Sequence, residues 1–327
     1  MRAAFIPRLG PASDIRYGEV PEPVPGPTDV LVDVAAVSVN PVDTFVRSGL
    51  FPTPLPFPFV IGRDLVGTVA RVGPGAPRFA PGDRVWTNSL GHDGRQGAAA
   101  ERAAVPADRL YHLPPGVDPT TAVAVVHPAA TAHLALFTHG GLRTGETVLV
   151  AGGGGNVGGA LIVLAAEAGA RVVTTARPDD AEHCRALGAT EVLDYRSPDL
   201  PDLVRAACPG GIDLHLDTSG TNDLTTAVDL LAPRGRIVLL AGARSRPELP
   251  AGQLYMKDGS IRGFVISHAS GAELADAAAT VNRLLAAGRL RPRALEIRPL
   301  SAAAETHQRL EKGELNGRRV VLTTPGP

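Results

Sequence analysis

The chain has 327 residues, enough for two domains, and its 32 Lys and Arg against 33 Asp and Glu give a formal net charge of −1. This balance gives no electrostatic footprint for nucleic acid or for an anionic membrane surface. Two cysteines, Cys184 and Cys208, are too few for a zinc site of three or four thiolates. No signal-like segment opens the chain, and no apolar run reaches the roughly 18 residues that span a bilayer. We therefore expect a cytoplasmic protein that binds no metal, no nucleic acid and no membrane.

Residues 1 to 125 predict a β-rich module, because short apolar and β-branched runs alternate with Gly and Pro turns. The runs expected to form strands are 1–6, 30–39, 65–72, 84–87, 98–105 and 110–111. Residues 40–43, Asn-Pro-Val-Asp, predict a turn or the start of a short helix. The segment 51–59, FPTPLPFPF, is too rich in proline for regular structure and predicts an extended loop over a pocket. Many short strands in succession indicate a compact barrel-like or sandwich module.

Helical patterns at 118–126 and 129–137 lead into residues 146–176, which read ETVLVAGGGGNVGGALIVLAAEAGARVVTTA. This stretch predicts a strand, a glycine-rich turn, a helix over 160–168 and a second strand. The spacing Gly-x-Gly-x-x-Gly is the dinucleotide fingerprint. A side chain at the first two glycines would keep a pyrophosphate away from the main chain, and the third glycine lets the helix pack close to the strand. A glycine turn without a ligand is the alternative. The candidate contacts are Gly153, Gly155, Asn156, Val157 and Gly158.

The residue that distinguishes NAD from NADP follows about 20 positions after the glycines. Thr175 stands there instead of an acid. Arg177, two residues later, can hold a 2′-phosphate through a bidentate hydrogen-bonded fork. We therefore expect NADP(H) as the cofactor, with Thr175 and Arg177 among its contacts. Asp179 and Asp180 lie nearby and weaken this case, and a solvated loop arginine is the alternative.

Strand and helix patterns keep alternating after the fingerprint, which predicts an α/β fold with a doubly wound parallel sheet. The further strands expected are 192–195, 213–217, 236–240 and 260–265, with helices at 201–207 and 224–231. A long helix is expected over 271–287, and then strand, helix and strand over 296–300, 302–312 and 319–323. We expect this tail to pack on the first module. Residues 126–265 would then form the dinucleotide-binding domain, and residues 1–125 and 266–327 the substrate domain.

Several motifs along residues 1 to 325 match a known family pattern: VNPVDT at 39–44 followed by RSG at 47–49, GRDLVG at 62–67, PGDRV at 81–85, ATAH at 130–133 and GRRVVL at 317–322. With them the chain resembles the medium-chain dehydrogenase/reductase superfamily and, more narrowly, its zinc-independent quinone oxidoreductase branch, related to zeta-crystallin. The resemblance implies a Rossmann domain, a β-rich GroES-like domain and a homodimer formed through the sheet edges of the nucleotide-binding domains. Zinc alcohol dehydrogenases of this superfamily carry Cys where Asn40 stands and Gly-His-Glu at 62–64. The resemblance therefore implies no catalytic zinc in this chain.

The resemblance also implies residues for the chemistry. Asn40, whose amide can donate to a developing oxyanion, is implied near the nicotinamide, with a turn cap as the alternative. Asp43 and Asp64 are further candidates, although Asp64 can equally cap a turn or pair with the arginine before it. Phe51 stands on the substrate loop, where related reductases often carry an aromatic hydroxyl. His127 is a candidate proton donor, with a structural histidine as the alternative.

For the cofactor, the resemblance implies that Thr131 contacts the nicotinamide carboxamide or a ribose phosphate, with a hydroxyl bonded to its own helix as the alternative. The remaining implied contacts are Tyr195 and Ser219 at the adenosine and Gly242, Phe264 and Ile266 at the nicotinamide. These features predict an NADPH-dependent reductase of quinones or activated enones, in which the cofactor carries the hydride. The alternatives are a biosynthetic enone reductase with a narrow substrate and a non-catalytic NADPH-binding sensor.

Overall fold

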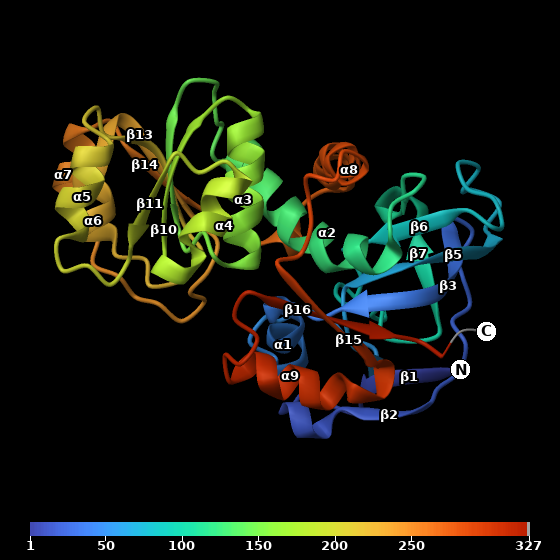
Figure 1. Cartoon of the computed structure of the whole chain (residues 1–327). Coiled ribbons are helices and arrows are strands. Elements are labelled where there is room, and N and C mark those ends of the chain that lie inside the picture. Colours follow the sequence, from blue (N-terminus) through green and yellow to red (C-terminus); the bar gives the residue numbers. More distant parts are fainter. Residues whose placement is uncertain (326–327) are drawn as a thin grey trace. The chain divides into compact units, whose positions relative to one another are not determined.

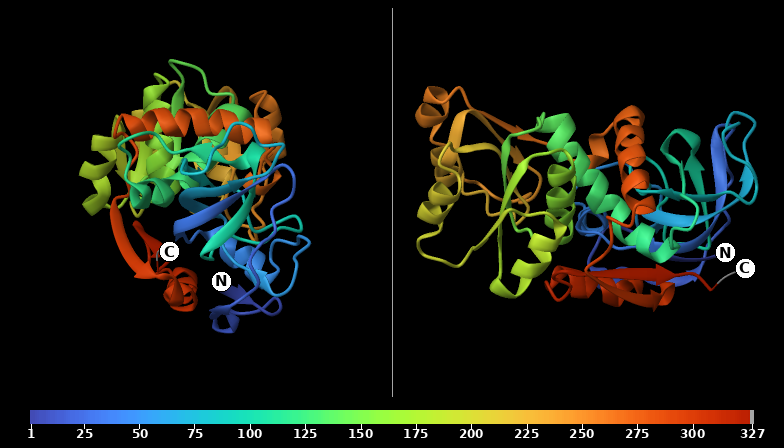
Figure 2. Two further views of the ribbon diagram at one scale, coloured as in Figure 1. Left: turned by 90° about the vertical axis from the view of Figure 1, so that its right-hand side faces the viewer. Right: turned by 45° about the horizontal axis from the view of Figure 1, so that its top comes forward.

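The computed structural model describes residues 1–325, and the chain divides into two compact units (Figure 1). The first unit comprises Met1–His127 and the chain from Ser270 onward, and the second comprises Pro128–Ala269. The predicted domain boundaries follow residues 125 and 265, and residues 326 and 327 of the predicted substrate domain lie outside the described residues. Both the N-terminal strand β1 (Arg2–Ile6) and the C-terminal strand β16 (Arg318–Thr323) belong to the first unit (Figure 2).

The second unit is built on a six-stranded, entirely parallel sheet with the order β11-β10-β9-β12-β13-β14. The strands are β9 (Thr147–Ala151), β10 (Arg171–Ala176), β11 (Glu191–Asp194), β12 (Ile212–Asp217), β13 (Leu231–Leu239) and β14 (Ser260–Gly263). Helices α3 (Asn156–Glu167) and α4 (Ala181–Leu187) cover one face, and α5 (Leu200–Ala207), α6 (Leu224–Leu230) and α7 (Ala251–Met256) lie on the other (Figure 1). The strand order reverses between β9 and β12, which confirms the predicted doubly wound α/β fold.

Several element bounds in this unit differ from the prediction. Strand β13 begins at Leu231, five residues before the predicted start at 236. Helix α3 begins at Asn156, four residues before the predicted start, because Gly155 is extended and acts as the N-cap (φ −82°, ψ 168°). Asn156 and Val157 therefore belong to the first helical turn and not to the glycine turn. Strand β14 ends at Gly263, so Phe264 lies beyond the strand in which it was predicted, and Ile266 begins the short 3-10 helix η5 (Ile266–His268).

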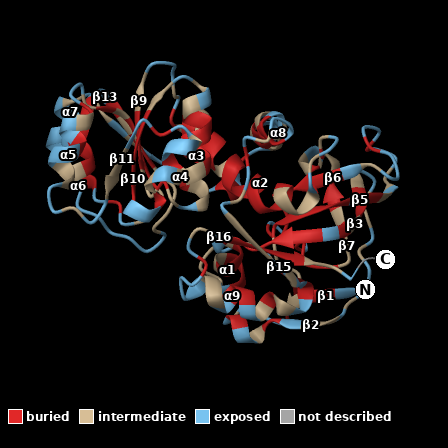
Figure 3. Ribbon diagram, viewed as in Figure 1, coloured by how far each residue is buried: buried red, intermediate tan, exposed pale blue. Residues whose placement is uncertain are grey.

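The first unit holds two sheets. The larger has the order β15-β16-β3-β5-β6-β8, and β7 also pairs with β3; the smaller has the order β2-β1-β4. The strands not yet given are β2 (Arg16–Glu19), β3 (Asp29–Ser38), β4 (Phe59–Val60), β5 (Asp64–Val72), β6 (Arg84–Thr87), β7 (Arg102–Pro106), β8 (Tyr111–His112) and β15 (Ala294–Pro299). The α-helices that lie entirely within this unit are α1 (Pro41–Ser48), α8 (Gly271–Ala286) and α9 (Ala303–Glu311). Buried residues follow the strands of both units (Figure 3), as expected for β-branched runs that form a core.

The tail from β15 to β16 packs as predicted, since β16 pairs with β3. The prediction for 51–59 is wrong at its end. Phe59 is 1% exposed and forms β4 with Val60, which pairs with β1, so Phe59 is a core residue. The remainder of the segment has no regular structure.

Helix α2 (Pro119–His133) runs through Pro128 and passes into the π-helical turn η3 (Leu134–His139), so the two predicted helical stretches form one helix. By length and composition, Pro119–His139 could cross a membrane. However, 83% of its most apolar window is buried inside the protein, as in the core helix of a globular unit.

Candidate functional site

The glycine-rich turn between β9 and α3 is shaped by contacts that leave no room for side chains. A Cβ at Gly158 would lie 2.1 Å from the carbonyl oxygen of Gly152, and a Cβ at Gly153 would lie 2.2 Å from Oγ1 of Thr174. A Cβ at Gly155 would meet only the Gly152 carbonyl oxygen, at 3.3 Å. Gly153 and Gly158 are thus required by packing within the protein, whereas a Cβ at Gly155 would make one tight contact and no overlap.

The N-terminus of α3 fits an anionic ligand. Its N-cap, Gly155, has no side chain to bond the first N–H groups of the helix. Unbonded N–H groups and the positive end of the helix dipole bind phosphate at such positions. The predicted contacts Asn156, Val157 and Gly158 supply these N–H groups, so the turn fits a dinucleotide pyrophosphate.

At the end of β10, Thr175 and Arg177 both have partners inside the protein. The backbone N–H of Gly152 donates to Oγ1 of Thr175 at 3.2 Å, so this threonine supports the glycine turn. Nε of Arg177 donates to Oδ2 of Asp180 at 3.3 Å, and the Arg177 side chain is 48% exposed. Asp180 is 5% exposed, and its carboxylate lies against Gly154 of the turn. The ion pair thus holds Arg177 close to the glycine turn.

The other predicted cofactor contacts, except Thr131 in α2, follow the carboxyl ends of the remaining parallel strands. Tyr195 follows β11, Ser219 follows β12, Gly242 follows β13, and Phe264 and Ile266 follow β14. This edge of an open parallel sheet is where α/β proteins bind ligands. Phe264 stacks on the ring of His139 with 4.5 Å between ring centroids, within the same unit.

Two residues that the sequence analysis missed join the loops after β12 and β13. Asp217 accepts hydrogen bonds from the backbone N–H groups of Ser219 and Asn222, both at 2.7 Å, and from the Ser219 hydroxyl. Asn222 adopts a left-handed conformation (φ +52°), and its amide donates to the carbonyl oxygen of Ala241 at 3.0 Å. The Ser219 hydroxyl is therefore committed to Asp217. An Asp-Thr-Ser-Gly sequence directly after a buried strand was the available signal.

In the first unit, Asp64 lies at the centre of a buried polar network. Its Oδ2 accepts from the Ser38 hydroxyl at 2.8 Å and from the Asn40 amide at 2.7 Å, and its Oδ1 lies 3.0 Å from Nδ1 of His127. Asp64 is fully buried. Burial alone would raise the pKa of Asp64, but His127 and the hydrogen bonds from Asn40 and Ser38 outweigh burial and lower it. The structure therefore brings three predicted site residues together around an ionised carboxylate: Asn40, Asp64 and His127.

Arg319, from β16, completes the network and was not predicted. Its Nη2 donates to Oδ1 of Asn40 at 2.8 Å and to the Ser38 hydroxyl at 3.0 Å. The Asn40 amide thus bonds Asp64 through its nitrogen and Arg319 through its oxygen, which leaves one N–H for a further partner.

Asp43 occupies the first turn of α1, where its Oδ2 accepts from the backbone N–H of Asn40 at 2.7 Å. Burial and the nearby Asp64 raise the pKa of Asp43 to about 7, although the Asn40 N–H, His127 and Arg63 act in the opposite direction. Asp43 is therefore partly protonated near neutral pH and can act as an acid or a base there.

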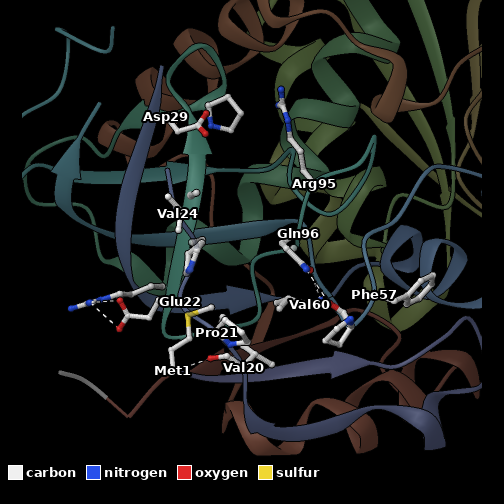
Figure 4. A pocket seen from close by; sticks show the side chains of 18 residues that line it. Met1, Val20, Pro21, Glu22, Val24, Asp29, Phe57, Val60, Arg95 and Gln96 are labelled. Carbon is white, nitrogen blue, oxygen red and sulfur yellow. Dashed lines mark hydrogen bonds and ion pairs between the residues drawn. The ribbon is translucent and has the colours of Figure 1, made fainter. Parts of the chain in front are cut away.

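Phe51, the remaining predicted catalytic residue, is partly buried and packs against the hydrophobic core of the first unit. A pocket of about 420 Å³ also opens on this unit (Figure 4). It is lined in part by Met1, Val24, Phe57 and Gln96, and none of the predicted site residues lines it. Among residues 1–325, no group of three or more His, Cys, Asp or Glu side chains could hold a metal ion.

Known proteins similar to this chain share both units. Residues 26–115 match the alcohol dehydrogenase GroES-like domain family, and residues 156–283 match the zinc-binding dehydrogenase family. A quinone oxidoreductase from Sus scrofa is 32% identical over 301 residues, covering 91% of this chain and 90% of that protein. A mycobacterial protein solved in complex with NADPH is 30% identical, with a TM-score of 0.85 over 99% of both chains. An NAD-dependent alcohol dehydrogenase structure is 33% identical, with a TM-score of 0.88 over 99% of both chains.

Proposed function

Because this chain belongs to the quinone oxidoreductase branch of the medium-chain dehydrogenase/reductase superfamily and is an oxidoreductase, we propose that it uses NADPH to reduce quinones or activated enones. The observation that carries this proposal is the glycine turn before α3, together with the exposed guanidinium of Arg177 at the end of β10. When bound, NADPH supplies the hydride.

The choice of NADPH over NADH rests on Arg177. No acid occupies the last position of β10, where Ala176 stands, and Arg177 follows directly. Its pairing with Asp180 uses Nε, and a guanidinium has further N–H donors with which to bond a 2′-phosphate. One similar structure is of a protein bound to NADPH and another is named as NAD-dependent, so the relatives alone do not decide between the two cofactors.

The proposed chemistry of the first unit needs no metal. The side chains of the Asp64 network can orient a substrate and donate hydrogen bonds to it, but they do not form a set of metal ligands. Asn40 has an N–H left to donate, and Nδ1 of His127 is held by Asp64 at 3.0 Å. Guanidinium groups do not coordinate metals, and an amide is a weak ligand for zinc. A flat carbonyl compound reduced by hydride needs a donor at its oxygen and a proton, and this unit supplies both types of group.

Two other functions are alternatives to the proposed reduction of quinones or enones. An enone reductase with one biosynthetic substrate would have the same cofactor turn and the same Asp64 network. A non-catalytic NADPH-binding sensor would retain the turn and bind the cofactor without turnover.

We also propose a homodimer formed through β14, which lies at the edge of the parallel sheet. Tyr255 and Met256 at the end of the neighbouring α7 are each 78% exposed, and exposed apolar side chains beside a free strand edge favour self-association. Light scattering after size exclusion should give twice the chain mass for the wild type, and Met256→Arg should weaken the dimer. Val24→Arg, at a 90% exposed residue of the first unit, is the matched control.

The test of the proposed reaction is oxidation of NADPH and NADH by the purified protein with a panel of 1,4-quinones and enones. We expect acceptor-dependent loss of NADPH well above that of NADH. Arg177→Ala should reduce the affinity for NADPH about tenfold or more and leave that for NADH unchanged, because a charge-assisted hydrogen bond contributes ~1.5–3 kcal/mol. Arg196→Ala, an exposed arginine paired with Asp194, is the control. Binding of NADPH without turnover of any acceptor would favour the sensor.

A further inference from the structure

Arg63 is a buried cation that the known contacts do not explain. Its side chain is 1% exposed, yet Nε and Nη1 have no hydrogen-bond partner among the described residues. A buried charge without partners costs several kcal/mol, so a protein that retains one commonly uses it to bind something.

Asp43 also has a buried polar atom without a hydrogen-bond partner. Its Oδ2 is bonded to the backbone of Asn40, but its buried Oδ1 has no partner among residues 1–325. Arg63 and Asp43 interact electrostatically, because each favours the charged form of the other. They form no ion pair, so their unpaired atoms do not satisfy each other. An oxygen atom bound between the two side chains, a position that we call the gap, would accept from Arg63 and from the protonated form of Asp43.

The charges around Arg63 favour an anionic oxygen in this gap. Asp64 is already bonded by Ser38, Asn40 and His127 and forms no ion pair with Arg63. His92 does not compensate for Arg63, because burial and the nearby Arg63, Arg109 and Arg95 lower the pKa of His92 to about 3 and keep it neutral. Arg319 adds a second buried cation to the network. When Asp43 is protonated, Asp64 is the remaining described carboxylate that interacts electrostatically with both Arg63 and Arg319.

We propose that Arg63 is a catalytic residue that binds the carbonyl oxygen of the substrate, and that Asp43 is the acid that protonates this oxygen. This assignment rests on the proposed reduction of quinones or enones. For an enone, a hydride forms a C–H bond at the β-carbon while the π electrons shift and leave the negative charge on the carbonyl oxygen. Arg63 stabilises that charge through hydrogen bonds. The proton of Asp43 then moves to the oxygen and gives the enol, the nicotinamide is oxidised, and solvent reprotonates Asp43.

The first experiment measures turnover in Arg63→Met, Arg63→Lys and the control Arg95→Met, which changes an exposed arginine of the same unit. We expect Arg63→Met to reduce kcat about 100- to 1,000-fold, the effect of removing one oxyanion donor, with the NADPH dissociation constant unchanged. Arg63→Lys should recover part of this loss, and Arg95→Met should match the wild type. Asp43→Asn should remove the decrease of kcat that the wild type shows as pH rises through 7. A kcat for Arg63→Met within threefold of the wild type would overturn the assignment.

A second experiment does not depend on turnover or on the proposed function. 4-Nitrophenol has distinct absorption bands as phenol and phenolate, so titration of the bound compound reports on stabilisation of an oxyanion. We expect the wild type and Arg95→Met to lower its apparent pKa relative to free solution, and Arg63→Met to abolish this shift. If no acceptor is reduced by the wild type but the shift depends on Arg63, the proposed reaction is wrong and the oxyanion site is retained. If acceptors are reduced and neither kcat nor the shift responds to Arg63, the gap holds only water and the inference is wrong.

Discussion

The contact that excludes a side chain at Gly158 gives the most direct test of the glycine turn. An alanine Cβ there would lie 2.1 Å from the carbonyl oxygen of Gly152 and 2.9 Å from the Cα of Gly153. Ordinary van der Waals contacts begin near 3.4 Å, so the carbonyl of Gly152 must move by about 1.3 Å to accommodate the new Cβ. The contacting atoms all belong to the main chain, which cannot move as easily as a side chain. Overpacking of this kind costs ~1–3 kcal/mol.

Gly159→Ala is a matched control in the same helical turn. Its Cβ would meet the terminal methyl Cδ1 of Leu187 at 3.2 Å and the carbonyl oxygen of Gly153 at 3.8 Å. A leucine methyl moves more easily than a backbone, and alanine in a helix gains ~0.5–1 kcal/mol over glycine. Gly159→Ala should therefore be as stable as the wild type or slightly more stable.

The assay combines urea unfolding of the free protein with calorimetric titration of NADPH. If the turn of the free Gly158→Ala protein changes its conformation to accommodate the alanine, the overpacking energy appears as weaker NADPH binding. The NADPH dissociation constant then rises about 5- to 150-fold for ~1–3 kcal/mol. If the turn does not relax, the cost appears in the free energy of unfolding. A Gly158→Ala protein with both quantities unchanged would refute the steric argument, and so would an equal loss in Gly159→Ala.

Three further outcomes are expected from single substitutions. Burial raises the pKa of Asp43 to about 7 from the ordinary 3.8, so the stability that this carboxyl contributes is present below about pH 4 and is lost as pH rises through 7. Urea titrations should therefore show that the free energy of unfolding of the wild type falls between pH 4 and 7 by up to about 4 kcal/mol more than that of Asp43→Asn. An equal pH dependence of the unfolding free energy in the two proteins would contradict this. Ser270→Ala removes the N-cap hydroxyl of α8, which accepts from the backbone N–H of Glu273 at 3.2 Å, and should cost ~1 kcal/mol in thermal or urea unfolding. Leu161→Ala, at a fully buried position of α3, should cost ~2–5 kcal/mol, whereas Leu203→Ala, at a 40% exposed position, should cost clearly less.

The second unit was predictable because its signals are local. The strand, the glycines and α3 are consecutive, and β10 follows within a few residues, so periodicity and spacing fix their order. The start of α3 was predicted too late because the sequence does not reveal that Gly155 is extended and caps the helix. The link between Asp217 and Asn222 is also local, but its effect on the loop after β13 depends on how the two loops meet in the fold.

The first unit was less predictable because its polar network is assembled from distant segments. Asn40 and Arg319 are 279 positions apart, and no local pattern connects a loop after β3 with a strand at the other end of the chain. The sequence offered Arg63 as a natural ion partner for Asp64, its neighbour. In the structure, Asp64 instead bonds Ser38, Asn40 and His127. Arg63 lies in the bend before β5, and Asp64 is the first residue of that strand, so the two charges are neighbours in sequence without being paired.

This arrangement of Asp64 also explains how the first unit can keep Arg63 without a direct partner. A guanidinium with no negative charge nearby would be too costly to bury. Asp64 supplies that charge from beside Arg63 without occupying its N–H groups, because its two oxygens are bonded to other side chains. The cation is stabilised electrostatically while its Nε and Nη1 keep no hydrogen-bond partner among the described residues. A neutral Asp64→Asn variant should therefore weaken both the fold and the binding of 4-nitrophenolate, whereas Arg63→Met should abolish phenolate binding at little cost to stability. If both variants lost stability equally, the Arg63 guanidinium would be a structural group and not a donor kept open for a substrate.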